Sequence, residues 1–539
     1  MRARRRGIVR ATAVGLGLAA LAVLAVLPSA AAKAPATKVT APATASGLVA
    51  PARTVLEIKR HLRSLGIDPS GVVIQRGSKN YAGPNCPGRE WNCTTATKVV
   101  QLSPSRAGSG ADDDDENRFV CKKQRGTGGV VTKVETPPDQ SCFVLQPGGS
   151  SNSATCDIRT FGSTGRITQT CFITQGGASN NAVARLFAAM GSNGGNQDIR
   201  QRIEIKQTGG SSGNTLNASE TAALGALRNA GGAAAGVTQD FNQIVCGNQT
   251  ASGNGSNTAT VNQHGGAAAA FSNADLVDID QNRDSIASAC TDAGGPTGPG
   301  AGPFADYTLS CAVEGGSGSP KLEANTCSRI EQVAASGRNR ITRQDQKNLL
   351  FASVDGAADV FIDQGTSLGG IDSTQNQQSS PSKTSSIVDV QAVDQIVSVK
   401  NATGFVLVTQ DEDPRCCSVQ QGSTSDTWSI DQRLNQKVFV DGELADPNVF
   451  VQDGAVYGHC ETTGTCKVRQ KASNNADEKS NSCTVSGSLY ERGSCDIFIT
   501  CTAGSGGGSA FRPAAATRPA GRARVVDNGG ECIPGPVPD

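Results

Sequence analysis

The chain has 539 residues, of which 64 are glycine, two are methionine and only 4% are aromatic. This composition excludes a thick globular core, because few large side chains are available to fill one at the packing density of protein interiors. The formal net charge of +1 gives no sign of the strongly basic surface that a nucleic-acid partner normally requires. We therefore expect a thin core that is repeated along an axis.

The N-terminus has the three-part layout of a secretory signal peptide. Arginines cluster within residues 1–10, residues 11–27 are nearly all apolar, and Ala30-Ala31-Ala32 offers a cleavage site of small residues. The apolar run is shorter than the roughly 20 residues of a membrane-spanning helix, so we expect residues 1–32 to be cleaved off. The mature chain would then be secreted, extracellular or associated with the cell surface, and it would have no transmembrane span.

A flexible leader, residues 33–52, and an N-terminal cap, residues 53–139, are predicted next. The cap contains the clearest helix pattern of the chain, residues 54–65, in which Thr54 and Glu57 form a capping box. A cysteine-containing turn segment follows this helix.

Strand patterns dominate the rest of the chain. Eleven five-residue windows place two apolar residues at alternate positions and a glutamine two residues later, as in Ile203-Glu-Ile205-Lys-Gln207. Successive side chains of a strand point to opposite faces, so each window puts two apolar groups and one amide on the same side. We expect the glutamines to point inward in stacked rows that satisfy their amides, with Glu204, Lys206, Asp278 and Asp280 outward. The predicted row members are Gln146, Gln175, Gln207, Gln263, Gln281, Gln364, Gln410 and Gln432.

The windows define two β-repeat regions, residues 140–290 and 336–470. A Gly/Pro-rich linker, residues 291–335, with Cys311 and Cys327, separates them. A cysteine-rich segment, residues 471–502, and a disordered tail, residues 503–539, follow. Glutamines that recur 32 residues apart, such as Gln175 and Gln207, indicate a repeat of that length. The predicted fold class is all-β, a β-solenoid of stacked short strands with a small helix-containing cap and disulfides.

All 18 cysteines lie in the predicted mature region, and disulfides are the usual fate of cysteines in an exported chain. No cysteine spacing fits a metal site, so no metal and no cofactor is predicted. The adjacent Cys416 and Cys417 fit two separate partners better than one strained bridge.

Arg5-Arg6 resembles the twin-arginine export signal, but the many cysteines that need oxidation favour the general secretory route.

Two segments follow a recurring pattern of amides and small residues. Gln175-Gly-Gly177-Ala-Ser-Asn180-Asn-Ala182 fits Gln-x-Gly-x-x-Asn-x-Ala, and Asn257-Thr-Ala259-Thr-Val-Asn-Gln263 fits Asn-x-Ala-x-x-x-Gln. In these parts the chain resembles curlin subunits, which are secreted strand–turn–strand repeats that stack into cross-β surface fibres. The resemblance implies amides that stack on their counterparts in neighbouring rungs. The repeat lengths vary and the cysteines are foreign to that family, so it covers only part of the chain.

The sequence contains no familiar catalytic motif. Its three histidines, His61, His264 and His459, stand in no metal-binding or Ser-His-Asp pattern, so no catalytic or cofactor-binding residue is predicted. An alternative hypothesis is a carbohydrate-active β-helix enzyme, a polysaccharide lyase or hydrolase. It would use the cluster Asp278, Asp280 and Arg283, because paired carboxylates can cleave glycosidic bonds.

The favoured function is that of a secreted structural or adhesive repeat protein. Such a protein is an extracellular scaffold or a component of a cell surface or matrix. Its repetitive face would bind itself or an extracellular polymer, and no nucleic acid.

Overall fold

The computed structural model describes a chain that is folded almost entirely into β-strands. The described residues belong to a compact unit, Gly47–Asp539. They are 63, 69–103, 115–125, 140–162, 165–190, 197–228, 238–272, 276–281, 321–355, 359–366, 371–377, 387–400, 406–412, 415–416, 427–441, 449–462, 464–475, 478–486 and 491–504.

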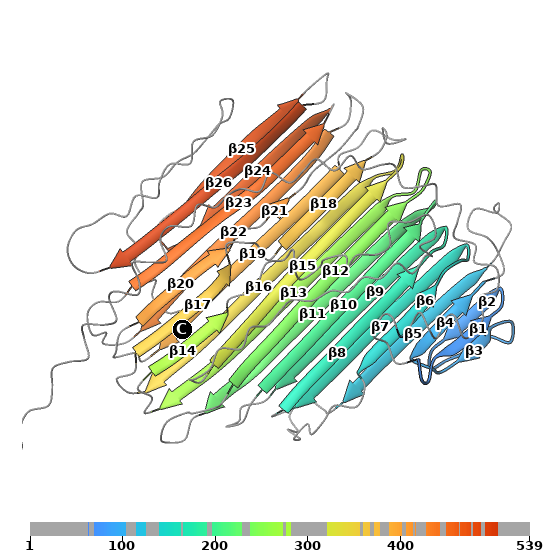
Figure 1. The fold of residues 1–539 in the computed structure, drawn as a ribbon, viewed down its shortest axis with the longest axis horizontal. Helices are drawn as coiled ribbons and strands as arrows, with labels where there is room; N and C mark the ends of the chain where they lie inside the picture. Colours follow the sequence, from blue (N-terminus) through green and yellow to red (C-terminus); the bar gives the residue numbers. More distant parts are fainter. Residues whose placement is uncertain are drawn as a thin grey trace, which may run out of the picture. The chain divides into compact units, whose positions relative to one another are not determined.

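The strands form two sheets, one of 14 strands and one of 12 (Figure 1). Sheet A contains β1 (Val73–Arg76), β4 (Lys98–Leu102), β6 (Ser141–Gln146), β8 (Gly165–Gln175), β10 (Gln197–Gly209), β12 (Thr238–Ala251), β14 (Leu276–Gln281), β15 (Lys321–Ala334), β17 (Asp359–Thr366), β18 (Ile371–Gln377), β20 (Val406–Glu412), β21 (Arg415–Cys416), β23 (Val449–Thr462) and β26 (Glu491–Gly504). Sheet B contains β2 (Lys79–Ala82), β3 (Asn92–Thr94), β5 (Glu116–Arg125), β7 (Ser151–Gly162), β9 (Ser179–Met190), β11 (Gly213–Arg228), β13 (Asn257–Ser272), β16 (Asn339–Asp355), β19 (Ile387–Lys400), β22 (Thr427–Asp441), β24 (Thr465–Ser473) and β25 (Glu478–Ser486).

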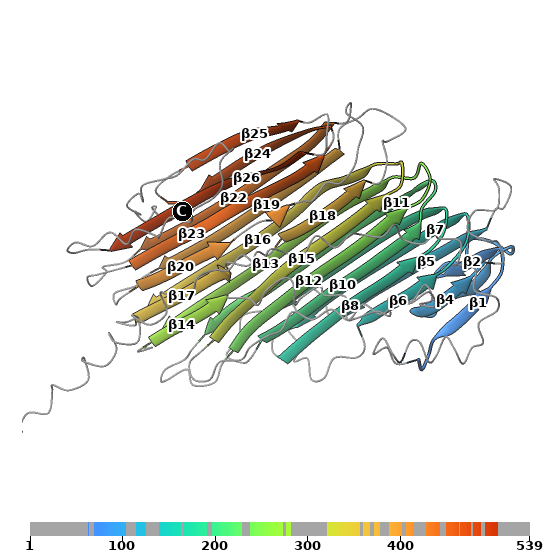
Figure 2. The ribbon, with the colours of Figure 1, turned by 45° about the horizontal axis from the view of Figure 1, so that its top comes forward.

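The chain passes back and forth between the two sheets. From β6 to β13, each strand of one sheet is followed by a strand of the other. Successive strands of one sheet then pair in parallel, and Figure 2 shows β8, β10, β12 and β15 side by side in this way. Only the last strands differ among those described, because β25 and β26 pair antiparallel with β24 and β23. Parallel strands stacked by a chain that returns turn after turn are typical of a β-solenoid.

Successive rungs stack so that similar residues face each other. Gln201 of β10 pairs with Gln243 of β12, and Ile203 pairs with Val245. On the other side of β10, Ile203 pairs with Cys171 of β8. Because side chains alternate with a period of two, this register keeps the inward positions of β8, β10 and β12 on the same face.

The number of residues between stacked positions varies along the chain. It is 32 from Gln175 to Gln207, 42 from Gln207 to Gln249, and 83 from Gln249 to Gln332. The predicted repeat of 32 residues therefore describes the step from β8 to β10 and not the steps beyond it. Gln239, which lies 32 residues after Gln207, pairs instead with Gln197. The register is not continuous over these longer steps, since it shifts between Leu224 and Leu227 where β11 pairs with β13, and between Ala259 and Thr260 where β13 pairs with β16.

The core is thin and consists mainly of small and branched side chains. One cluster of buried residues extends from Ala82 in β2 to Ile341 in β16. Its inward isoleucines, such as Ile203 and Ile205, are at most 2% exposed. Each of these side chains stabilises the fold by about 1.5–3 kcal/mol relative to exposure.

Disulfides connect the two sheets through this core. Cys121 of β5 is bonded to Cys142 of β6, and Cys156 of β7 to Cys171 of β8. Two further bridges, Cys86–Cys93 and Cys460–Cys466, close shorter loops. No cysteine is free in the part of the chain that the structure describes. The disulfide prediction is confirmed for these residues.

The strands do not follow the predicted segment borders. β1 to β5 lie in the predicted cap and pair with the repeats, while β15 lies in the predicted linker, residues 291–335, and pairs with β12 along its whole length. The Gly/Pro run that suggested the linker, residues 291–303, is outside the described residues. So are the predicted signal peptide and leader, the tail beyond residue 504 and, apart from Arg63, the predicted helix 54–65. Within the described ranges no helix is long and apolar enough to cross a membrane.

Candidate functional site

A row of glutamine amides runs from rung to rung inside sheet A. Each Nε2 donates a hydrogen bond to Oε1 of the glutamine in the preceding rung, over 2.7–3.2 Å. All members are at most 2% exposed. We call this set the long glutamine row, and its members are Gln75, Gln101, Gln146, Gln175, Gln207, Gln249, Gln332 and Gln375.

Each amide of the row has a second partner across the core. Gln207 Nε2 also donates to the backbone oxygen of Thr215 in β11 at 2.8 Å, and Gln249 Nε2 to that of Thr258 in β13 at 3.0 Å. The amide group thus uses both N–H bonds while its oxygen accepts from the next rung. A buried amide without such partners would cost about 1–3 kcal/mol, so the row allows glutamines inside a thin core.

A matching row of asparagines runs through sheet B. Here Nδ2 of each residue donates to Oδ1 of the asparagine in the following rung, over 2.8–3.0 Å. The direction of donation is opposite to that of the long glutamine row. The asparagine row consists of Asn80, Asn117, Asn152, Asn180, Asn214, Asn257 and Asn339.

The Gln-x-Gly-x-x-Asn pattern links the two rows through a tight turn. Gln175 ends β8, and the Gly177 N–H donates to Asn180 Oδ1 at 2.9 Å while Asn180 Nδ2 donates back to the Gly177 oxygen at 3.0 Å. A Cβ atom at position 177 would collide with the Asn152 side chain and with the backbone oxygen of Gly149. Glycine is therefore required here because the rungs approach closely.

Six of the eight predicted row members have described side chains, and each of the six is buried with an amide or carboxyl partner. Gln146, Gln175 and Gln207 belong to the long glutamine row. Gln263, Gln410 and Gln432 lie in shorter rows, with partners Glu220, Gln452 and Gln391. Gln281 and Gln364 pair with each other in β14 and β17, but their side chains lie outside the described ones.

The predicted row members include neither the asparagine row nor a second glutamine row, although the curlin-like pattern contains Asn180 and Asn257. Gln201 Nε2 donates to Gln169 Oε1 at 2.8 Å, and Gln243 Nε2 to Gln201 Oε1 at 2.9 Å. An asparagine five to eight residues after a row glutamine, as in Gln175 to Asn180, is a sequence signal that finds every member of the asparagine row except Asn117.

The two predicted outward residues of β10 differ in exposure. Glu204 and Lys206 alternate with the inward Ile203, Ile205 and Gln207. Lys206 is partly exposed, whereas Glu204 is 8% exposed and forms an ion pair with Arg202. Burial raises the pKa of Glu204, and the adjacent Arg202 charge offsets part of this effect.

One short row ends on a buried carboxyl group. Gln263 Nε2 donates to Glu220 Oε2 at 2.9 Å, and Glu220 is fully buried. Its other oxygen, Oε1, has no hydrogen-bond partner, and the apolar Leu186 occupies the paired position in β9. Burial raises the pKa of Glu220 well above its ordinary value, and the bond from Gln263 offsets only part of this. This shift favours the protonated, neutral form of Glu220.

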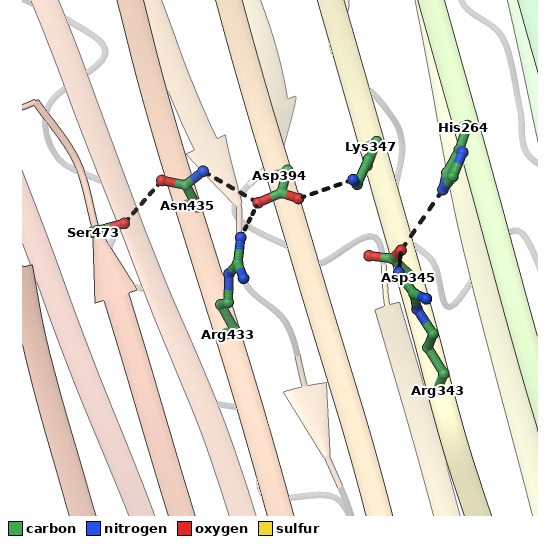
Figure 3. Close-up of polar contacts among 8 residues, drawn as sticks. All are labelled: His264, Arg343, Asp345, Lys347, Asp394, Arg433, Asn435 and Ser473. Atoms are coloured by element: carbon green, nitrogen blue, oxygen red, sulfur yellow. Dashed lines mark hydrogen bonds and ion pairs between the residues drawn. The ribbon is translucent and has the colours of Figure 1, made fainter.

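A chain of polar contacts crosses the outer face of sheet B (Figure 3). Asp394 of β19 accepts from Arg433 Nη2 at 2.9 Å and from Asn435 Nδ2 at 3.2 Å, and it lies 3.8 Å from Lys347 Nζ. Asn435 in turn accepts from Ser473 Oγ at 2.9 Å. We call these residues, together with His264, Arg343 and Asp345, the paired row.

His264 contacts an aspartate at the end of the paired row. Asp345 forms an ion pair with Arg343, and its Oδ2 lies 3.7 Å from His264 Nε2. Burial raises the pKa of Asp345, but the contact with His264 and the Arg343 charge outweigh it, so this pKa lies below its ordinary value. In a nucleophilic triad the histidine would also bond a hydroxyl or thiol. Figure 3 shows Ser473 at the opposite end of the row, bonded to Asn435. The row is a set of ion pairs and hydrogen bonds in which the aspartates are buried and the cations are partly exposed.

A depression of about 330 Å³ lies on the same outer face, over β9, β11 and β13. Thr260 of its lining bonds to Thr342 at 2.6 Å. The side chains of Arg185, Asn217, Ser219 and Asn262 have no hydrogen-bond or ion-pair partner among the residues that the structure describes. We call this feature the Arg185 depression, and its outward lining is Val183, Arg185, Asn217, Ser219, Thr260 and Asn262.

Two aromatic side chains lie on the same outer face as the polar lining of the depression. Phe187 follows Arg185 by two positions on β9, so it lies on the same face. Its ring is 5.5 Å from that of Phe161, and both are partly exposed. The volume is at the lower end of the roughly 300–1,000 Å³ that small-molecule pockets occupy. The site therefore has room for a small polar ligand or for one unit of a polymer.

The alternative enzyme cluster is described only in part. β14 places Asp278 and Asp280 at alternate positions, where they pair with Phe361 and Asp363 of β17. The side chains of both aspartates and the whole of Arg283 lie outside what the structure describes. Among the described residues, no group of three or more histidine, cysteine or acidic side chains is placed to hold a metal ion.

Comparison of the chain with protein-family models, with curated proteins and with solved structures finds no match. The resemblance to curlin subunits therefore stays a prediction from the sequence.

Proposed function

We propose that the protein is a secreted structural or adhesive repeat protein, which binds an extracellular polymer through the outer face of sheet B. The main support is the contrast between the two faces of that sheet. Inward amides such as Asn214 are paired in rows, whereas Arg185, Asn217 and Asn262 on the outer face have no side-chain partner in the described part of the chain. Polar groups without internal partners are free to bond an external one.

The ends of the stack favour polymer binding over growth into fibres. Addition of further copies needs long strand edges that continue the parallel pairing. The terminal strands β1 and β3 have only 4 and 3 residues, and β25 and β26 at the other end run antiparallel. The long glutamine row also closes, because Gln75 Nε2 donates to the backbone oxygen of Tyr81 at 2.9 Å. Contacts through the faces of the sheets are therefore the better hypothesis.

Electron microscopy and co-sedimentation test this proposal on the mature protein. We expect discrete particles that pellet together with at least one insoluble polysaccharide from a panel of cellulose, chitin and calcium pectate. Fibres that lengthen with concentration, without polymer binding, would contradict it in favour of self-assembly. Release of new sugar ends from the polymer would instead support the enzyme alternative.

A further inference from the structure

The Arg185 depression carries an unpaired positive charge. Arg185 on β9 pairs in register with Asp157 of β7 and with Ser219 of β11. Asp157 is bonded to Arg159 Nε at 3.1 Å, and the exposed Arg185 side chain has no ion-pair partner. The guanidinium group is thus available to an external anion.

Neutral donors and acceptors lie next to this charge. Ser219 pairs in register with Asn262 of β13, and Asn217 precedes Ser219 by two positions on the same face of β11. Neighbouring strands are about 4.8 Å apart, so the row Arg185, Ser219 and Asn262 offers a polar group at each strand spacing. Amides and hydroxyls of this kind can both donate to and accept from the hydroxyl groups of a sugar.

The combination of one guanidinium with several neutral groups selects the chemistry of the ligand. Guanidinium binds carboxylates in a planar, two-point geometry. A simple carboxylate would make no hydrogen bond to Asn217 or Asn262, which would stay hydrated. A neutral sugar would make no ion pair with Arg185. A uronic acid unit carries a carboxylate and ring hydroxyls together, so it satisfies both parts of the lining.

We propose that the Arg185 depression binds a uronic acid unit of an acidic polysaccharide, with the carboxylate on Arg185 and the hydroxyls on Asn217, Ser219 and Asn262. This rests on the proposed function and specifies the class of its polymer. The paired row does not compete for the ligand, because Arg433 and Arg343 are committed to Asp394 and Asp345.

Titration calorimetry of the mature protein with a soluble oligogalacturonate tests the site. We expect Arg185→Gln to weaken binding by at least tenfold, because the charge-assisted contact is lost. Ser219→Phe should weaken it by a similar factor, because an outward ring fills the floor of the depression while suiting a strand. Arg469→Gln is the matched control, since Arg469 is an exposed arginine on the same sheet but on β24. It should bind within twofold of the unaltered protein.

Two further ligands show which chemical group of the ligand, the carboxylate, the hydroxyls or a sulfate, the site recognises. The methyl ester of the same oligosaccharide keeps the hydroxyls and loses the charge, so it should bind at least tenfold more weakly. A sulfated oligosaccharide that bound more tightly than the uronate would overturn the assignment to uronic acid. Unchanged binding by both Arg185→Gln and Ser219→Phe would place the site elsewhere and leave the proposed function standing. If the unaltered protein pelleted with no polysaccharide at all, the proposed function would fail as well.

Discussion

Asn214 and Asn217 lie three residues apart on β11, and the two faces of sheet B use them in opposite ways. Asn214 is 1% exposed, accepts a hydrogen bond from Asn180 and donates one to Asn257. Asn217 lines the Arg185 depression and has no partner within the protein. The comparison teaches that the same amide stabilises the fold on one face and is available for recognition on the other. Substitutions should therefore separate stability from binding.

The largest loss of stability is expected from Gln207→Leu. The change removes the acceptor of Gln249 and the donor to Gln175, and each buried group left unpaired costs about 1–3 kcal/mol. We expect the free energy of unfolding to fall by about 3 kcal/mol in urea titrations. Lys206→Leu, on the opposite face of the same strand, should change it by less than about 0.5 kcal/mol. If Lys206→Leu lowered the free energy of unfolding more than Gln207→Leu, the assignment of inner and outer faces would be reversed.

A pH-dependent effect is expected from Glu220→Gln. Because burial raises the pKa of Glu220 above its ordinary value of 4.5, the folded protein keeps a proton that the unfolded chain releases. The stabilisation by the neutral acid is complete below pH 4.5. As the pH rises from 4.5 towards the raised pKa, the free energy of unfolding decreases by about 1.4 kcal/mol per pH unit. The unaltered protein should therefore lose stability relative to the variant between pH 5 and 6. If the free energy of unfolding of the two proteins changed equally with pH, Glu220 would have to be charged in the folded protein.

A smaller effect is expected from Asp394→Ala in the paired row. Asp394 is only 8% exposed, but its partners Arg433 and Lys347 keep side-chain exposures of 54% and 38%, so the solvent reaches the cationic side of both pairs. Exposed ion pairs contribute about 0–1 kcal/mol and are screened by salt. Thermal unfolding should show a loss of about 1 kcal/mol or less at low ionic strength, which disappears in about 1 M salt. A loss that persisted at high salt would mean that Asp394 is part of the core.

The smallest change in stability is expected from Asn217→Ala. Its side chain has no internal partner, so the free energy of unfolding should change by less than about 0.5 kcal/mol. Asn214→Ala should cost about 1–3 kcal/mol, because Asn180 and Asn257 each lose a partner. Equal effects of the two substitutions in the same urea titration would remove the distinction between the faces.

Much of the repeat architecture follows from local sequence patterns. Alternation in Ile203-Glu-Ile205-Lys-Gln207 predicts a strand with an inward amide, since the side chain period of two leaves no other way to bury both isoleucines. The small supply of large side chains predicts a thin core. The helix pattern of residues 54–65 stays a prediction, because those residues lie outside the described ones except for Arg63.

The pairing of rungs, in contrast, was decided by the tertiary structure. Gln207 stacks on Gln249 and not on Gln239, and Gln249 stacks on Gln332 across 83 residues. Connections of any length can join two rungs at a low cost in chain entropy, so a fixed sequence period cannot identify the partner. The raised pKa of Glu220 and the open polar lining around Arg185 also depend on which strands lie beside them. By itself the sequence determined which side of a strand such as β10 faces inward, because alternation is a local property. Only the fold determined which amides, charges and hydroxyls meet, because that depends on the register of distant rungs.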